Sequence, residues 1–410
     1  METETGENEK EETKEDTEQK DPKNYKDFLE SAVERKKFKT KIKEYCVKHR
    51  IALIIIGSVI LMAAILTFLG FHFLLRGGKA IETTNTLVSD NTAATPAAPI
   101  LYEAPLDGVK TDQASATRHP LAVMIENHPD ARPQSGLDKA SIVYEAIAEG
   151  GITRFMAVYG TNLPDKAGPV RSARTYFVDW AEGYNAYLAH VGGNIDALDK
   201  IKADKVQDLD EFKFSECSAV YCRDLSNKKL ATEHTMYGYP QALLDAAAKF
   251  SYSSANNFTL YKFKDDPTSD EAAALPVSQK ITVNFSSPTY KVEYNYDQAT
   301  NSYKRFLAGV AQLDKITKVQ LNPKNVIVMT VKRQEIKTRI NEEGYNMTTI
   351  GTGPAEIFID GKDIKGTWKK TSSTARETFY DATGAEITFN RGQTWISVIP
   401  PETTSSVTVQ

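Results

Sequence analysis

The apolar and polar residues of this chain recur with two different periods, and the change between them divides the chain. From His119 to about residue 275, apolar runs of strand length alternate with stretches of helical spacing. The predicted strands are LAVMIEN (121–127), IVYEAIAE (142–149), ITRFMAVYG (152–160) and AYLAHV (186–191). The predicted helices begin near Pro169, at NIDALDKIKAD (194–204) and at YPQALLDAAAKF (239–250). This mixture predicts an α/β or α+β exterior domain over 118–275, with a mixed sheet and helices packed on it.

Beyond residue 275 the helical spacing disappears. Segments that alternate between apolar and polar residues are broken by Gly, Asn and Asp, which is typical of antiparallel strands joined by turns. These segments are 281–286, 290–309, 325–336, 348–370, 376–390 and 394–400. The pattern predicts a small, mostly antiparallel β domain over 279–402, followed by a loose tail (403–410).

One apolar run is far longer than a strand. Residues 51–75, IALIIIGSVILMAAILTFLGFHFLL, carry no formal charge, and about 20 apolar residues suffice to cross a bilayer. The run therefore predicts one N-terminal transmembrane helix. Eight Lys and Arg residues lie between Arg35 and Arg50, whereas only Arg76 and Lys79 closely follow the run. The positive-inside rule then predicts a single-pass protein of the cell membrane, with a cytoplasmic N-terminus and extracytoplasmic C-terminal domains.

Composition separates the segments on either side of this run. Residues 1–24 are acidic and almost free of apolar residues, which predicts a disordered cytoplasmic tail. Residues 25–50 predict a basic amphipathic juxtamembrane helix, which either lies on the membrane surface or is solvated. Residues 76–117 are rich in Thr, Ala, Asn, Ser and Pro, which predicts an extracytoplasmic linker.

Charge and motifs exclude several classes of function. The formal net charge is −4, which argues against a nucleic-acid partner because such partners need a basic surface. No dinucleotide fingerprint, P-loop or GxSxG motif is present, and no cofactor is predicted. Cys217 and Cys222 lack the spacing of a zinc site. A disulfide between them and two buried thiols remain equal alternatives.

A pair of glycines joins two of the predicted strands. Gly150 and Gly151 are the signal of a two-residue hairpin turn. Such a turn would bring Glu145, Glu149 and Arg154 onto one face of the hairpin, because alternate residues of a strand share a face. This cluster is either a structural salt bridge or the polar wall of a pocket.

The stretch GPVRSAR (168–174) carries two arginines at a predicted helix start. Pro169 favours the first position of a helix, and Arg171 and Arg174 follow it. Two cations at the positive end of a helix dipole are unfavourable unless an anion lies close to them. That anion is either a carboxylate of the fold or a carboxylate or phosphate of a ligand.

Polar side chains also gather where predicted strands end, and such positions often line a ligand crevice. The candidate ligand-binding residues are Asn127, His128, Arg132, Arg154, Arg171, Arg174, Gly192, Gly193 and Asn194. The candidate acid–base residues are Glu126, Glu145, Glu149, His190 and His234. The exterior histidines could meet at a metal, but no pair of them has the spacing of a zinc motif, so no metal is predicted.

Several of these stretches resemble one family. PLAVMIENHPDARPQSGLDKASIVYEAIAEGGITRFMAVYG (120–160), GPVRSARTYFVDWA (168–181) and HVGGN (190–194) are similar to the YerB family of bacterial envelope proteins, a domain of unknown function. The segments NVIVMTV, GTGPAEIFIDGK and TWISVIP resemble its companion C-terminal domain. The resemblance implies a place in the envelope and this division into two domains, but no activity. Family members are described as lipoproteins, whereas here no Cys directly follows the apolar run. His234-Thr235 stands where the family often has His-Asn.

The sequence therefore leaves two functions open. The first is a membrane-anchored extracytoplasmic envelope protein that binds an anionic ligand or partner, such as a wall glycan, a stem peptide or an envelope enzyme. The second is an envelope hydrolase or lyase that acts on cell-wall material through Glu and His acid–base residues.

Overall fold

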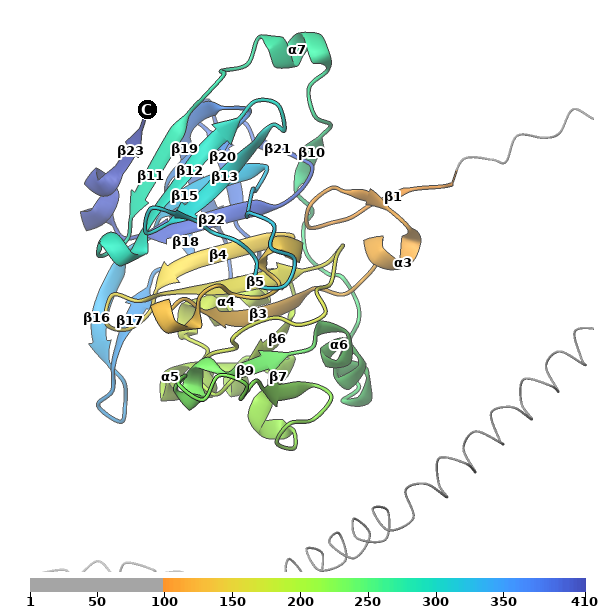
Figure 1. Ribbon diagram of the computed structural model, residues 1–410, viewed down its shortest axis with the longest axis vertical. Helices are drawn as coiled ribbons and strands as arrows, with labels where there is room; N and C mark the ends of the chain where they lie inside the picture. Colours follow the sequence, from red (N-terminus) through yellow and green to blue (C-terminus); the bar gives the residue numbers. More distant parts are fainter. Residues whose placement is uncertain (1–98) are drawn as a thin grey trace, which may run out of the picture. The chain divides into compact units, whose positions relative to one another are not determined.

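The computed structural model describes residues 99–410, and their strands form one large mixed sheet and a second, antiparallel sheet (Figure 1). The predicted acidic tail, juxtamembrane helix, transmembrane helix (51–75) and most of the linker lie outside the described residues. Within residues 99–410, no helix is both long and apolar enough to span a bilayer.

The large sheet has ten strands, and four neighbouring pairs of them are parallel. From edge to edge the strands are β20 (Thr378–Asp381), β19 (Lys362–Lys370), β18 (Gly351–Ile359), β15 (Asn325–Thr330), β22 (Thr394–Ile399), β4 (Ile142–Ile147), β5 (Thr153–Tyr159), β3 (Leu121–Glu126), β6 (Tyr187–His190) and β7 (Asp208–Asp210). Every residue of β3, β4, β15 and β22 is buried, because both faces of the sheet are covered. The predicted mixed sheet is confirmed, although helices are few.

The second sheet has five antiparallel strands. They are β14 (Val310–Ala311), β13 (Ser302–Leu307), β12 (Lys291–Asp297), β11 (Lys280–Asn284) and β23 (Val407–Val409). This sheet is the separate antiparallel region that the alternating C-terminal pattern predicts. The expectation of a loose tail over 403–410 is wrong, because β23 pairs with β11.

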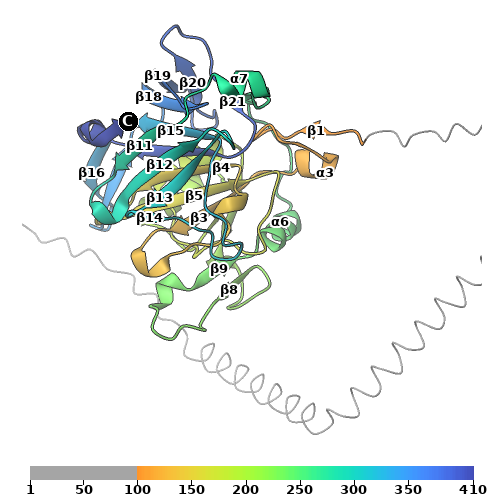
Figure 2. The same cartoon turned by 45° about the horizontal axis from the view of Figure 1, so that its top comes forward.

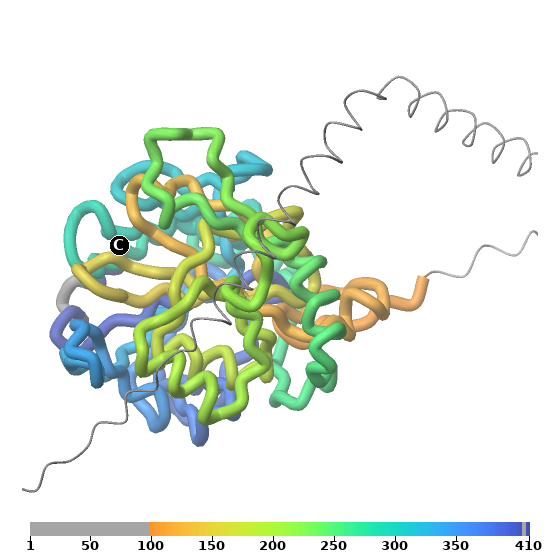
Figure 3. Tube along the Cα trace, turned by 90° about the horizontal axis from the view of Figure 1, so that it is seen from below, coloured from red at the N-terminus to blue at the C-terminus, as the bar shows by residue number. Residues whose placement is uncertain are grey.

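The expected small β domain needs a further correction, because five of its strands belong to the large sheet. The five C-terminal strands form one half of the sheet and the five N-terminal strands form the other half. The two halves join where β22 pairs in parallel with β4. Figure 3 shows the blue C-terminal segments beside the yellow and green N-terminal ones. The two predicted domains therefore share one continuous sheet, which is joined between β22 and β4.

Each face of the large sheet carries its own hydrophobic core. The five-stranded sheet and α6 (Pro240–Lys249) cover one face, with contacts to Val123, Val143 and Phe155 (Figures 1 and 2). On the other face, α4 (Thr175–Glu182) and α5 (Ile195–Ala203) pack against Tyr144 and Met156. Successive residues of a strand point to opposite faces, which is why neighbours in sequence contribute to different cores.

Smaller elements complete the fold. The short helices are α3 (Gln113–Ala116), α7 (Ser269–Ala273) and the 3₁₀ turns η1 (Pro129–Ala131), η2 (Leu137–Lys139), η3 (Glu211–Lys213), η4 (Thr232–His234), η5 (Pro288–Tyr290) and η6 (Pro401–Ser406). The remaining strands pair as β1 (Tyr102–Glu103) with β2 (Lys110–Thr111), β8 (Tyr221–Arg223) with β9 (Met236–Gly238), β10 (Lys262–Lys264) with β21 (Thr388–Asn390), and β16 (Arg333–Lys337) with β17 (Glu343–Met347). The predicted linker ends earlier than residue 117, since Ala104 and Leu106 are already buried. Cys217 and Cys222 form a disulfide, which resolves the alternative left open by the sequence.

The β4–β5 hairpin differs from the predicted one by a single residue. A two-residue turn would pair Glu145 with Met156, but the sheet pairs Glu145 with Phe155. The loop has three residues, Glu149–Gly151, and both of its glycines have a positive φ (61° and 73°). Because a one-residue slip in register moves side chains to the other face, Glu145 and Arg154 lie on opposite faces of the hairpin. The predicted single cluster does not form.

Residues 168–174 do not begin a helix, contrary to the prediction. The segment runs alongside β3, and an antiparallel bridge joins Val170 to that strand. α4 begins only at Thr175, and Arg174 is its N-cap residue with extended backbone angles. Arg171 therefore lies outside the helix, so the argument from a helix dipole does not apply to it.

Candidate functional site

Glu145, a candidate acid–base residue, is the centre of a buried ion pair between the two sheets. It forms an ion pair with Arg305 of β13, and neither side chain has any exposed surface. The guanidinium of Arg305 lies 4.1 Å from the ring centroid of Trp395, and its Nε donates to the hydroxyl of Tyr294 at 3.3 Å. The hydroxyl of Thr153 donates to the other carboxylate oxygen at 2.9 Å. A ligand from solution has no access to this buried pair. The ion pair therefore serves to hold the two sheets together.

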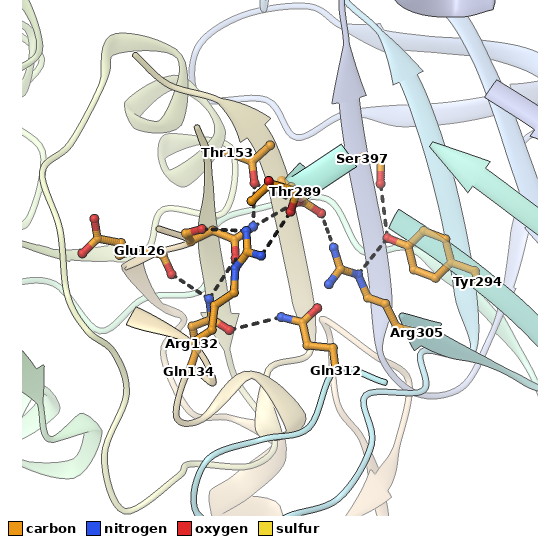
Figure 4. Close-up of polar contacts among 11 residues, drawn as sticks. Glu126, Arg132, Gln134, Thr153, Thr289, Tyr294, Arg305, Gln312 and Ser397 are labelled. Atoms are coloured by element: carbon orange, nitrogen blue, oxygen red, sulfur yellow. Dashed lines mark hydrogen bonds and ion pairs between the residues drawn. The ribbon is translucent and has the colours of Figure 1, made fainter. Parts of the chain in front are cut away.

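A chain of hydrogen bonds leads from this pair toward the surface (Figure 4). The amide of Asn127 donates to Thr153 at 2.7 Å, and its oxygen accepts from Arg132 at 3.0 Å and from Gln134 at 2.9 Å. Arg132 also donates to the carbonyl oxygen of Thr289 at 3.1 Å, and burial lowers its pKa. Asn127 is fully buried, so it positions Arg132 and is not itself open to a ligand.

Glu149 neutralises two of the candidate arginines. Arg174 donates to both carboxylate oxygens of Glu149, from Nε and, at 2.6 Å, from Nη2. Arg154 lies 3.8 Å from the same carboxylate and donates to the carbonyl oxygen of Ser172 at 2.8 Å. Burial would raise the pKa of Glu149, but the hydrogen bonds and charge of Arg174 outweigh it and lower that pKa. Burial and the charge of Arg174 lower the pKa of Arg154 to about 10.

Glu126 forms an ion pair with Arg171, and it also accepts a hydrogen bond from a histidine. Its Oε1 lies 3.2 Å from Nε of Arg171, and its Oε2 accepts a hydrogen bond from Nδ1 of His234 at 2.8 Å. The ring of His234 stacks on that of His128, with centroids 4.7 Å apart and planes 10° from parallel. The fold thus joins candidates from β3, the 168–174 segment and η4.

The HVGGN stretch pairs with the backbone of the 168–174 segment, but its polar side chains form hydrogen bonds within the fold. His190 is fully buried, with Nδ1 2.7 Å from the carbonyl oxygen of Gly192 and Nε2 2.8 Å from Asp208. Gly193 forms a bridge to the 168–174 segment, and Asn194 caps the N-terminus of α5. His190 therefore does not meet the other two exterior histidines that the sequence pointed to.

The His190 contact predicts a dependence of stability on pH. Burial would raise the pKa of the Asp208 carboxyl, but hydrogen bonds from His190 and Lys213 hold it below its ordinary value of 3.8. A carboxyl with a lowered folded-state pKa stabilises the fold above its unfolded pKa, and this contribution is lost as pH falls through the folded pKa. We expect urea unfolding between about pH 6 and about pH 3 to show a smaller loss of stability for Asp208→Asn than for the parent. Parallel curves for the two proteins would contradict this.

Two of the candidates, Arg132 and His234, line a cavity of about 140 Å³. We call it the Arg132 cavity, and the lining side chains used below are Asp130, Arg132, Asp224, His234, Tyr237 and Lys315. Lys315 donates to the hydroxyl of Tyr237 at 3.0 Å. Sequence reasoning missed Lys315, Asp224 and Tyr237, because they belong to no motif and reach the cavity only through the fold.

A larger cavity of about 300 Å³ lies at the β16–β17 hairpin, which the sequence did not predict as a hairpin. Glu149 lines it together with Glu335, Glu343, Lys337 and Tyr345. Both carboxylate oxygens of Glu149 already accept hydrogen bonds from Arg174. None of the candidate residues predicted from the sequence is therefore available to a ligand in this cavity.

Comparison with known proteins identifies the family. Residues 106–253 match the "Protein of unknown function (DUF3048) N-terminal domain", and residues 281–396 match the DUF3048 C-terminal domain. The chain belongs to the DUF3048 family. It is 29% identical over 306 residues to the "Putative lipoprotein YerB" of Bacillus subtilis (strain 168), an alignment that covers 74% of this chain and 88% of the relative. The resemblance predicted from the sequence is confirmed.

A solved structure supports the same assignment. The crystal structure of the YerB protein from Bacillus subtilis superimposes with a TM-score of 0.65 at 29% identity, covering 75% of this chain and 99% of the other. In this DUF3048 protein both family segments line the Arg132 cavity, since Arg132 and His234 come from the first and Lys315 from the second. The two segments therefore build one site, as they build one sheet.

Proposed function

We propose that this chain is an extracytoplasmic protein of the cell envelope that binds an anionic ligand in the Arg132 cavity. The location rests on the apolar run 51–75 with its preceding basic residues, and on the printed name of the relative YerB, which describes a lipoprotein. The proposed anchor is the predicted transmembrane helix, since no Cys directly follows the apolar run.

The observation that carries the proposal is the charge of the cavity. Within residues 99–410, neither Arg132 nor Lys315 forms an ion pair with a carboxylate, and both line the cavity. Of the two carboxylates there, Asp224 lies 3.7 Å from Nζ of Lys166, and Asp130 is largely exposed. Two cations without ion-pair partners beside a cavity favour an anionic group, because charge-assisted hydrogen bonds are stronger than neutral ones.

This assignment moves the anion site away from the arginines that the sequence emphasised. Arg154 and Arg174 share Glu149, and Arg171 faces Glu126. A cavity of about 140 Å³ is smaller than a typical pocket for a whole small molecule, about 300 Å³ or more. We therefore infer that it receives one carboxylate or phosphate group of a larger envelope ligand, such as a stem peptide or wall glycan.

The test uses the full-length chain and muropeptides that carry free carboxylates. We expect Lys315→Gln to weaken binding about tenfold in calorimetric titration, because one charge-assisted hydrogen bond is lost. Lys337→Gln, at an exposed lysine of β16, is the matched control and should bind as the parent does. Lys315 is the better probe than Arg132, whose guanidinium also holds Asn127 and Thr289. Absence of muropeptide binding by the parent, or equal binding by both variants, would overturn the proposal.

The Glu126–His234 contact supports a second candidate function, an envelope hydrolase or lyase. A carboxylate that accepts from Nδ1 fixes the imidazole so that its other nitrogen can transfer a proton. His234 also lines the Arg132 cavity. Soluble products released from purified wall material by the parent, and lost in His234→Ala, would favour catalysis over binding alone.

A further inference from the structure

We propose that His128, Asp130 and His234 form a binding site for one divalent transition-metal ion of the Zn²⁺ class. Each residue offers one ligand atom, and these atoms lie within 4.8 Å of one another. Imidazole nitrogen and carboxylate oxygen are ligands that Zn²⁺ uses, and three protein ligands leave a coordination position open for water or another ligand.

His234 is held by a neighbouring carboxylate in the way that is common for metal-binding histidines. Its Nδ1 donates to Glu126 at 2.8 Å, and its side chain is 8% exposed. No residue of the described chain forms a hydrogen bond with its Nε2, and the residue lines the Arg132 cavity. Metal-binding histidines commonly donate their second N–H to a carboxylate in this way, which fixes the ring and raises its basicity.

The other two residues can close on an ion. Two atoms bound to one Zn²⁺ lie at most about 4 Å apart, because Zn–N and Zn–O bonds are about 2 Å long. The ligand atoms therefore need to close by about 1 Å from their present separation. The side chains of His128 and Asp130 are 33% and 66% exposed, so both can turn toward the ion while Glu126 holds His234.

The present contact between His128 and Asp130 leaves room for this rearrangement. Nδ1 of His128 accepts from the backbone N–H of Asp130 at 3.3 Å, and lies 3.7 Å from its carboxylate. These are long, solvent-accessible contacts that an ion would replace with shorter bonds. The exposed Glu233 precedes His234, and it adds negative charge that offsets the nearby Arg171.

The metal site goes beyond the proposed anion site and does not depend on it. It shares Asp130 and His234 with the Arg132 cavity, whereas the anion proposal rests on Lys315 and Arg132. A bound dication would neutralise Asp130, the carboxylate of the cavity that has no lysine or arginine partner among the residues that the structure describes. The two proposals can therefore fail separately: metal binding is measured without muropeptide, and Lys315→Gln should leave it unchanged.

The experiment titrates the metal-free full-length chain with Zn²⁺ by calorimetry, and with Co²⁺ by its visible ligand-field absorption. We expect one ion to bind at this site, with Mg²⁺ unable to compete because it prefers oxygen ligands. His128→Ala and Asp130→Asn should each weaken Zn²⁺ binding at least about tenfold, and Glu126→Gln by about 10–100-fold.

Asp224→Asn is the matched control for Asp130→Asn, since both change a carboxylate of the same cavity and only one changes a proposed ligand. Thermal unfolding of each metal-free variant separates lost binding from lost folding. Zn²⁺ should raise the unfolding temperature of the parent and of Asp224→Asn equally, and should raise that of Asp130→Asn by less. Failure of the parent to bind Zn²⁺, or unchanged binding by the His128→Ala Asp130→Asn double variant, would overturn the proposal.

Discussion

Replacing Arg305 with Met is expected to lower the free energy of unfolding by about 3–5 kcal/mol. The substitution leaves Glu145 without its cation in a place where neither side chain has exposed surface. Met retains much of the packing against Trp395, so the loss reports mainly the unpaired buried charge. Urea unfolding followed by circular dichroism measures the change through the transition midpoint.

The double variant Glu145→Leu Arg305→Met provides the control. With both charges removed, we expect most of the lost stability to return, because replacing a buried ion pair with apolar residues is often neutral or stabilising. A loss of less than about 1 kcal/mol for Arg305→Met alone would mean that water reaches the carboxylate, and would contradict its assignment as a sealed contact between the sheets.

Replacing Glu149 with Gln is expected to cost about 2 kcal/mol, since it removes the carboxylate shared by Arg154 and Arg174. The value lies below that of a sealed pair because the Glu149 side chain is 32% exposed, and solvent screens part of the charge. Chemical denaturation at neutral pH and low salt is the measurement.

Arg174→Gln is the comparison for this change. It should cost less than Glu149→Gln, because Arg154 keeps the carboxylate in that variant and no like charges remain unpaired. If Glu149→Gln were as stable as the parent, the arginines would be adequately solvated without it. The arginines of the GPVRSAR stretch would then again be candidates for binding an anionic ligand.

The strands were the most predictable part of the fold. The runs at 121–127, 142–149, 152–160 and 394–400 are strands β3, β4, β5 and β22, because strands covered on both faces read as continuous apolar stretches. The hairpin register was not predictable, since Gly150 and Gly151 are compatible with a two-residue turn and with the three-residue loop that forms. One residue of loop length decided which face Glu145 occupies.

The candidate site was predictable in part. Glu126, His128 and Arg132 were identified because polar residues at a strand end often line a crevice, and the structure places them at one corner of the fold. Lys315 was missed because it lies in a loop without a motif. His190 was over-interpreted, since a histidine held by the fold and one open to a ligand look alike in sequence.

The sequence by itself determined the strand and helix periods, the apolar run 51–75 with its charge asymmetry, the family and the set of ionisable side chains available. The tertiary structure alone decided which of those charges meet. Glu126 contacts His234 across 108 residues of chain, and Glu145 contacts Arg305 across 160. Periodicity reports which face of an element a residue occupies, whereas ion pairs and metal ligands depend on distances of a few ångströms between different elements. Those distances follow from register and sheet order, which long-range packing sets.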